Sequence, residues 1–420
     1  MIWLWAAISI GLSFLIAKFK KVSFPHFIWL FLPIDFYGIQ IGNFLLKPYV
    51  LLFIALIIYT FIKKRKFLFE KDNNILFVFF FVFLICDIGS GLVANSIRQH
   101  VLFILFLCFS FVYSSYCKEK KEKEDVLNSI ISASIGYGVI NVVAAIFYLM
   151  NIKVPGLYGE SNCIIKTYIS MDIASSRMCG FEGDPNAFCI FYVIALAISS
   201  YLLFSNKKNS IFNVCGLLLS FSSIIFSKSR AALLLSLLVV LAVIILKIKS
   251  IVIKRRYGLI TSISLSLIGL IVFCLVKKID VTSLFVEVTN SQNRAGLFDS
   301  FGRVSIWVEN FKNMLILNPL FGIGSNQSYL YSSVGRACHN TWIEFCCSLG
   351  LVFGPIVVAI FLYPLFKKLY QRENVTLKVG LICSYLLLLT IDYIANIYIL
   401  IILCILLKTK EQRKLWKMSI

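Results

Sequence analysis

The residues best suited to chemistry in this sequence are one histidine and a few arginines, which stand in polar intervals of a strongly apolar chain. His339 is followed by Asn340 and then by a long apolar run, so we expect it at the N-terminus of a helix. The positive end of a helix disfavours a protonated imidazole, and a neutral imidazole can act as a general base near neutral pH. His339 is therefore the candidate catalytic residue.

Arginines in the polar intervals are candidates for binding an anionic substrate. They are Arg177, Arg230, Arg303 and Arg336. Arginine binds phosphate oxygens bidentately, and a pyrophosphate leaving group needs its charge stabilised as its bond breaks. With His339 as the base for an acceptor hydroxyl, this set is typical of sugar transfer from a polyprenyl pyrophosphate. The residues alone equally allow a phosphatase or a lipid transporter.

Three further residues are expected to support the site, namely Asn186, Asn340 and Glu344. Asn186 belongs to a Gly-Asp-Pro-Asn turn that suits the start of a helix, with Asp184 also in a capping role. Glu344 follows His339 by one helical turn plus one residue, so it can orient the imidazole ring or face water. No second His, Asp or Cys stands at ligand spacing beside His339, so we expect no metal and no cofactor.

Membrane helices must position these residues, because the composition is not that of a soluble globular protein. Of the 420 residues, 60% are hydrophobic and only 15% are charged, and the mean hydropathy is +0.89. The apolar runs are continuous rather than alternating, which favours α-helices over a transmembrane β-barrel. His26 and His100 lie at the edges of such runs, so we expect them to be amphipathic boundary residues. Lysines rather than a cleavage pattern follow the first run, so no cleavable signal peptide is expected.

The net charge of +21 could suggest nucleic-acid binding, but its distribution argues against such a partner. Of the 41 lysines and arginines, 28 lie in short stretches between apolar runs, as the positive-inside rule expects for cytoplasmic loops. These basic stretches are 18–23, 63–74, 117–125, 206–209, 247–256, 367–378 and 408–417. We therefore expect the N-terminus outside, the C-terminus inside, and no nucleic acid as partner.

The expected fold class is all-α, a polytopic integral membrane protein with about 12–13 transmembrane helices and two longer periplasmic loops. We treat 1–420 as a single membrane domain, with the first periplasmic loop at 151–185 and the second, larger loop at 277–344. The apolar segments run over about 2–17, 26–41, 49–62, 75–93, 101–116, 126–150, 186–204, 211–226, 231–246, 257–276, 345–366, 377–391 and 393–407.

The second loop contains a pattern that predicts an amphipathic helix over about 302–317. Such a helix can lie flat at the membrane interface, and Trp307 is expected to anchor it there. Its apolar stripe consists of Val304, Trp307, Phe311, Met314 and Leu315.

Four stretches resemble the O-antigen polymerase and O-antigen ligase superfamily, in order and spacing, over about residues 170–366. They are RMCGFEGDPNAFCIFYVIALAI, SRAALLLSLLVV, GRVSIWVENFKNMLILNPLFGIGSNQ and HNTWIEFCCSLGLVFG. The resemblance implies a glycosyltransferase of the bacterial inner membrane that uses undecaprenyl-pyrophosphate-linked glycans on the periplasmic face, without metal or nucleotide sugar. Carried over by position, Arg177, Arg230 and Arg303 would contact phosphates and sugar, and His339 would be catalytic. Arg336 has no assignable role in the family.

Polymerase and ligase share these motifs, and we favour the polymerase. A polymerase joins one lipid-linked repeat unit to a growing chain, whereas a ligase moves the finished chain to lipid A-core. A flippase for the same lipid-linked glycans is a further alternative, but it predicts short loops on both sides, and the loop 277–344 is long. Expected partners are the lipid-linked glycan, the bilayer and a chain-length regulator protein.

Overall fold

The computed structural model describes most of the chain up to residue 390. The described residues are 1–34, 39–41, 44–63, 74–91, 101, 104, 108, 112–113, 116, 120–159, 162–170, 173–205, 210–254, 303–324, 327–333, 335, 338–369 and 375–390. The apolar segments expected at 257–276 and 393–407 lie outside these residues.

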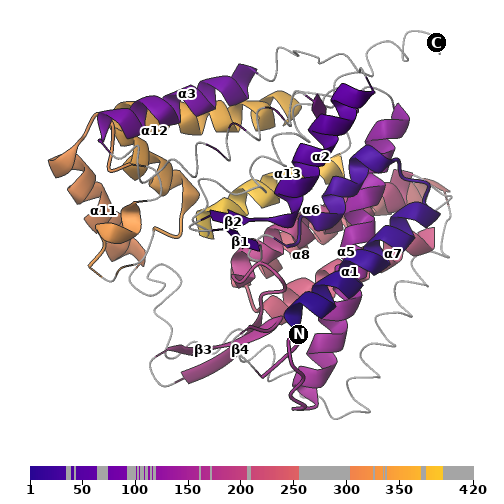
Figure 1. Cartoon of the computed structure of the whole chain (residues 1–420). Coiled ribbons are helices and arrows are strands. Elements are labelled where there is room, and N and C mark those ends of the chain that lie inside the picture. The colour runs from indigo at the N-terminus through magenta and orange to yellow at the C-terminus, as the bar shows by residue number, and fades with distance from the viewer. Residues whose placement is uncertain are drawn as a thin grey trace, which may run out of the picture.

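Helices dominate the described residues, with two short hairpins between them (Figure 1). The α-helices are α1 (Ile2–Phe19), α2 (Pro48–Ile62), α3 (Asn74–Gly89), α5 (Lys120–Leu149), α6 (Pro185–Ser205), α7 (Ser210–Ser227), α8 (Arg230–Lys254), α11 (Arg303–Leu317), α12 (Thr341–Leu369) and α13 (Val375–Leu387). The 3-10 helices are η1 (Phe24–Phe31), η4 (Ser328–Leu330) and η5 (Leu388–Thr390), and the strands are β1 (Ile39–Ile41), β2 (Phe44–Leu46), β3 (Ile165–Ser170) and β4 (Ile173–Met178).

Four stretches of helix within the described residues are long and apolar enough to cross a membrane, judged by length and composition. They are Ile2–Phe19, Glu124–Leu149, Pro185–Leu203 and Thr341–Ile360. The mostly helical fold of a polytopic membrane protein is thereby confirmed. The total of about 12–13 spans remains a prediction that rests on helix length.

The apolar segment expected over 26–41 is not a membrane helix. It forms η1, followed by the hairpin β1–β2, in which Ile39 pairs with Leu46. Pro33 follows η1 closely, and proline lacks the N–H that a continuing helix would need. Hydrophobicity alone predicted a membrane span here, but the missing N–H of Pro33 does not allow a continuous helix.

His26 belongs to η1, and the expectation that it lies at a membrane boundary is wrong. Its side chain is 1% exposed, and its Nδ1 shares a hydrogen bond of 2.6 Å with the hydroxyl of Tyr113. Trp29 donates to the same hydroxyl oxygen at 2.5 Å. His26 is therefore part of a buried polar network that fixes η1 within the core.

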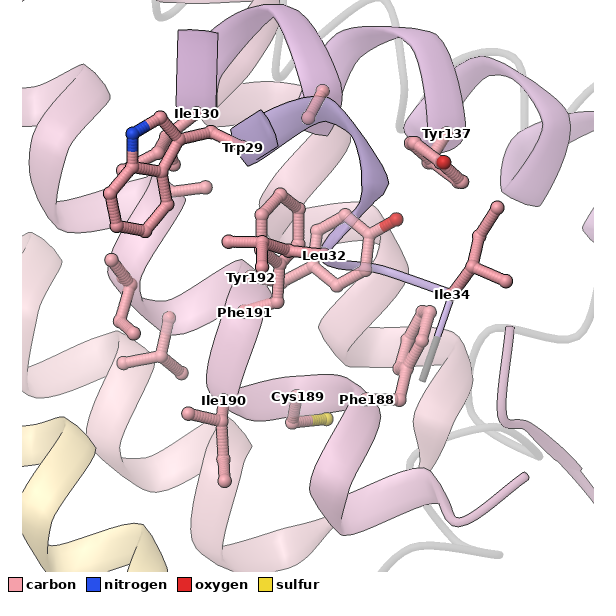
Figure 2. Packing of buried hydrophobic residues seen from close by; sticks show 14 of the residues in the cluster. Trp29, Leu32, Ile34, Ile130, Tyr137, Phe188, Cys189, Ile190, Phe191 and Tyr192 are labelled. Carbon is pink, nitrogen blue, oxygen red and sulfur yellow. The ribbon is translucent and has the colours of Figure 1, made fainter. Parts of the chain in front are cut away.

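The core centres on α6, which packs against α5, α7, α8 and α13. Side chains on every side of α6 are buried, including Phe188, Ile190 and Tyr192 (Figure 2). A helix that is apolar all round is expected in such a central position. Asn141 of α5 links three helices, because its side chain donates to the Tyr192 hydroxyl of α6 at 2.7 Å and to Ser223 of α7 at 3.1 Å.

A second group of helices, α3, α11 and α12, lies to one side of this bundle (Figure 1). Helix α12 is interrupted at Gly350, whose φ of 77° lies in the left-handed region. The loop before η4 supplies the lost backbone partners: Ile323 N donates to Cys347 O at 3.0 Å and Gly324 N donates to Ser348 O at 3.1 Å. A Cβ on Gly350 would collide with the carbonyl oxygen of Leu320. The break is thus held by close backbone-to-backbone packing that only glycine permits.

Helix α13 lies between the two groups, because it packs on α6 and α8 and also touches α12. Tyr385 of α13 stacks on Trp342 in the first turn of α12, with ring centroids 6.2 Å apart. The bundle and the second group therefore share one continuous interior.

Candidate functional site

The first polar interval of the chain forms a hairpin where the sequence suggested only a loop. Strands β3 and β4 pair antiparallel, and Arg177 near the end of β4 lies directly opposite Lys166. The hairpin therefore brings Arg177 to the residues that lead into α6.

The turn between α7 and α8, which we call the arginine turn and define as residues 227–230, meets this hairpin. Arg177 Nε donates to the carbonyl oxygen of Ser227 at 3.0 Å. Ser229 Oγ donates to Asn186 Oδ1 at 2.8 Å. The structure thus brings Arg177 and Asn186 to the turn that leads into Arg230, although these residues stand far apart in the sequence.

Helix α8 starts at the arginine turn and α6 starts beside it, and both helices are capped by side chains. Asp184 Oδ1 accepts from the backbone N–H of Asn186 at 2.7 Å and of Ala187 at 3.0 Å, which caps α6 behind Pro185. Ser229 Oγ accepts from Ala232 N at 3.5 Å at the start of α8. The partial positive charge at the start of α6 is offset by the Asp184 carboxylate, whereas the start of α8 is capped by a neutral hydroxyl and keeps its attraction for anions.

Within the arginine turn, the side chain of Arg230 has incomplete hydrogen bonding among the described residues. Its Nε and Nη2 atoms are buried and have no hydrogen-bond partner among the described residues, although the side chain as a whole is partly exposed. Buried charged donors without a partner are costly, so such groups are normally paired. A phosphate oxygen would supply the missing acceptor in charge-assisted bonds.

The second cluster, which we call the histidine mouth and define as residues 338–344, lies at the start of α12. Asn340 caps the helix, because its Oδ1 accepts from Trp342 N at 3.1 Å and from Ile343 N at 3.3 Å. His339 stands one residue before this cap, is partly exposed, and has a φ of 49°. Non-glycine residues with a left-handed backbone are uncommon and are often found at functional sites.

Glu344 lies inside the protein, which excludes the alternative that it faces water. Its side chain is 0% exposed, and Ser348 Oγ donates to its Oε1 at 2.9 Å. Ser328 and Cys338 also lie against the carboxyl group. Even so, neither Oε2 of Glu344 nor Oγ of Ser328 completes a well-formed hydrogen bond within the described part of the chain. The histidine mouth thus contains a buried carboxyl group with spare acceptor capacity.

The other two expected arginines cannot be placed against these clusters. Arg303 is the first residue of α11, and its side chain is not among those described. Arg336 lies outside the described residues. Within the described residues, no three His, Cys, Asp or Glu side chains lie together in a way that could hold a metal ion.

Helix α11 carries contacts that the sequence reasoning missed. Trp307 Nε1 donates to the carbonyl oxygen of Cys338 at 2.6 Å. The apolar stripe expected on this helix is divided: Met314 is buried, whereas Val304, Phe311 and Leu315 are exposed. The sequence contains no local signal for the Trp307 contact, because its partner lies in a separate turn of the long loop.

Comparison with known families finds a match to part of the chain. Residues 215–358 match the Wzy_C family model, which is described as O-antigen ligase. The match confirms the resemblance over the arginine turn, α11 and the histidine mouth, and these residues carry a Wzy_C domain. No curated protein and no solved structure matches the chain.

Residues 215–358 therefore carry a domain of the O-antigen ligase family within a multi-pass membrane protein. Arg177 and Asn186 precede the matched residues. Their place in the site rests on the contacts with the arginine turn.

Proposed function

We propose that this protein is a polymerase of O-antigen or a related surface polysaccharide. It joins undecaprenyl-pyrophosphate-linked oligosaccharide repeat units on the periplasmic face of the bacterial inner membrane. The observation that carries the proposal is the guanidinium group of Arg230, which presents two buried donors at the start of α8 without partners in the described part of the chain. Arg177 and the capped start of α6 adjoin the same turn.

In this mechanism the arginine turn binds the diphosphate of the donor. Arg230 and Arg177 contact the phosphate oxygens, and Arg303 and Arg336 are further candidates for the same role. As the bond between the anomeric carbon and the pyrophosphate oxygen breaks, the leaving group gains negative charge. Fixed donors stabilise that charge in the transition state, and this is the main source of the rate enhancement.

His339 acts on the acceptor. It removes the proton of the attacking sugar hydroxyl, whose oxygen forms the new bond to the anomeric carbon. Asn340 caps α12 beneath it, and Glu344 and Asn186 support the two halves of the site. The proton leaves His339 for solvent or for the released lipid pyrophosphate, so atoms and charges balance without a metal or cofactor.

A ligase that transfers the finished polymer to lipid A-core is the second candidate, because the matched family model is described as O-antigen ligase. Both activities break the same lipid pyrophosphate bond and differ only in the acceptor. The clusters described above bind the donor and activate a hydroxyl, so they serve either acceptor.

The surface polysaccharide of a strain that lacks this gene distinguishes the candidates. Core bearing a single repeat unit is the result expected for a polymerase. Core without any repeat unit, with polymer accumulating on the lipid carrier, would identify a ligase. An unchanged gel profile would overturn both assignments for O-antigen. Cysteine-reagent labelling at positions in 151–185 and 277–344 tests the proposed periplasmic orientation.

A further inference from the structure

We propose that Trp307 and Glu344 are positioning residues for His339, which act by holding Cys338 from two sides. This inference rests on the proposed function, because it assigns a purpose to the backbone geometry of the catalytic histidine. In this role neither residue touches substrate, because both act on the peptide groups that lead into His339.

The contact from Trp307 holds the peptide group that joins Cys338 to His339. Its indole N–H donates to the Cys338 carbonyl oxygen over 2.6 Å, and Trp307 is partly buried on α11. The φ angle of His339 describes rotation about the bond that leaves this same peptide group. A donor that fixes the carbonyl therefore restricts the direction in which the His339 side chain leaves the backbone.

Helix α11 makes two more polar contacts with the same loop. Asn313 Nδ2 donates to the carbonyl oxygen of Tyr331 at 2.7 Å. Glu309 Oε2 accepts from both N and Oγ of Ser333 at 3.0 Å. Asn313 and Glu309 thus hold the loop at two places before the histidine mouth, and Trp307 holds the first residue of the mouth itself. Trp307 is the one of the three that contacts the residue adjoining His339.

Glu344 holds Cys338 from the other side. Its carboxyl group lies against the backbone N–H and the thiol of Cys338, and Ser348 Oγ fixes Oε1 at 2.9 Å. Cys338 and Glu344 are both 0% exposed, so water does not compete for these contacts. The segment before His339 is therefore tied to α11 through its carbonyl oxygen and to α12 through the Glu344 carboxyl group.

The backbone of His339 explains why such restraint is needed. A φ of 49° is a conformation that side chains other than glycine rarely adopt, and it persists only when the surroundings impose it. Without the two contacts, the segment can relax to an ordinary backbone and carry the imidazole away from the acceptor hydroxyl. Small displacements of a catalytic group cost large factors in rate.

The experiment compares two matched tryptophan variants of the purified full-length chain in liposomes. Trp307→Phe removes the indole N–H and keeps an aromatic ring. Trp5→Phe is the control, because Trp5 is also partly buried and donates to a backbone carbonyl, that of Pro155 at 3.1 Å. The substrate is the lipid-linked repeat unit extracted from a strain lacking this gene. For Trp307→Phe we expect kcat to fall by about 10-fold or more, with KM for this substrate within about twofold, whereas Trp5→Phe retains both.

The Glu344 contact is tested by Glu344→Gln and Glu344→Leu. Glutamine keeps an oxygen that can accept from Cys338, so we expect it to retain most of the activity that leucine loses. The pH–activity profile is recorded for every folded variant. A displaced imidazole changes the acid side of that profile in Trp307→Phe, and a general loss of stability does not.

Wild type and His339→Ala are measured beside these variants, so that the two proposals fail separately. Wild type without transfer activity, or a fully active His339→Ala, overturns the proposed function. An active wild type whose Trp307→Phe variant matches Trp5→Phe overturns the positioning role alone. The role is also overturned if only the amount of folded Trp307→Phe falls, or if only its KM rises. Should Glu344→Leu fail to fold, the tryptophan pair decides the outcome.

Discussion

The arginine turn and the histidine mouth both hold side chains at the starts of helices, but different contacts fix them. Both place side chains at the start of capped helices, α6 and α8 in one case and α12 in the other. The arginine turn sits in the helix bundle and is held by bonds between helix ends. The histidine mouth is held by side chains of α11 and α12. The proposed anion site is therefore part of the core, whereas the geometry of the proposed base depends on a few contacts at the edge of the core.

The two clusters differ in the kind of polar group that lacks a hydrogen-bond partner. At the arginine turn, two donors of Arg230 are buried without partners among the described residues. At the histidine mouth, an acceptor oxygen of Glu344 is in that position. The two clusters therefore differ in whether the buried polar atom without a partner is a donor or an acceptor.

The largest effect is expected from removing the base. His339→Ala should lower transfer by about 100-fold or more, because general-base catalysis contributes factors of this size. His339 is partly exposed, so the protein should remain inserted and abundant. Gel profiles of polysaccharide and an immunoblot of the membrane fraction measure the two quantities. Tyr329→Phe, at an exposed position in the same loop, is the control. Long chains at normal abundance in His339→Ala would refute the assignment.

Removing the guanidinium group of the arginine turn should lower activity nearly as much. Arg230→Ala is expected to lower kcat/KM by about 100-fold, as the loss of a donor to a developing anion does elsewhere. Arg230→Lys should retain only part of the wild-type kcat/KM, because lysine cannot bind phosphate oxygens bidentately. Lys153→Ala removes an exposed positive charge before the hairpin and should change kcat/KM by less than about twofold. Equal activity of Arg230→Lys and wild type would show that a simple point charge suffices.

The helix break below the histidine mouth should matter for stability. A methyl group on Gly350 would collide with backbone and would stand at a left-handed φ, so Gly350→Ala should cost about 1–3 kcal/mol or more of folding free energy. Gly11→Ala in α1 is the matched control, because a Cβ there meets nothing within 4 Å. Thermal unfolding in detergent should separate the two. An unchanged transition temperature for Gly350→Ala would mean that the interruption is dispensable.

The smallest effect is expected on the outer face of α11. Val308 and Phe311 are exposed apolar side chains, and the proposed interfacial position would bury them in the lipid headgroup region. Phe311→Ser should therefore lower activity about two- to fivefold in liposomes and little in detergent. Lys312→Ser, at a neighbouring exposed position, should behave alike in both media. If Phe311→Ser is equally active in both media, this face does not contact lipid.

Local chemistry made part of the site predictable. Asp184 and Pro185 at the start of α6, and Asn340 at the start of α12, follow rules that involve only a few adjacent residues. The range of α11, Arg303–Leu317, lies close to that expected from helical spacing. The prediction of a membrane helix over 26–41 was wrong, because hydrophobicity does not report the effect of proline on the backbone.

Other parts of the site depend on residues that are distant in the chain. Trp307 was interpreted as a lipid anchor, yet its indole contacts Cys338. His26 was assigned to a boundary and instead bonds Tyr113 in the core. Glu344 had two open roles, and its burial removed one of them. In each case the side chain has several possible partners, and only packing selects among them.

The sequence by itself determined that this is a helical membrane protein, which residues could bind an anion or accept a proton, and where their helices begin. Those properties arise from hydrophobicity, charge and capping, which act over a few residues. Only the tertiary structure decided that Arg177, Asn186 and the turn before Arg230 meet. It also decided that the peptide before His339 is held by α11 and α12. Those contacts follow from how whole helices pack, and packing is a property of the entire chain.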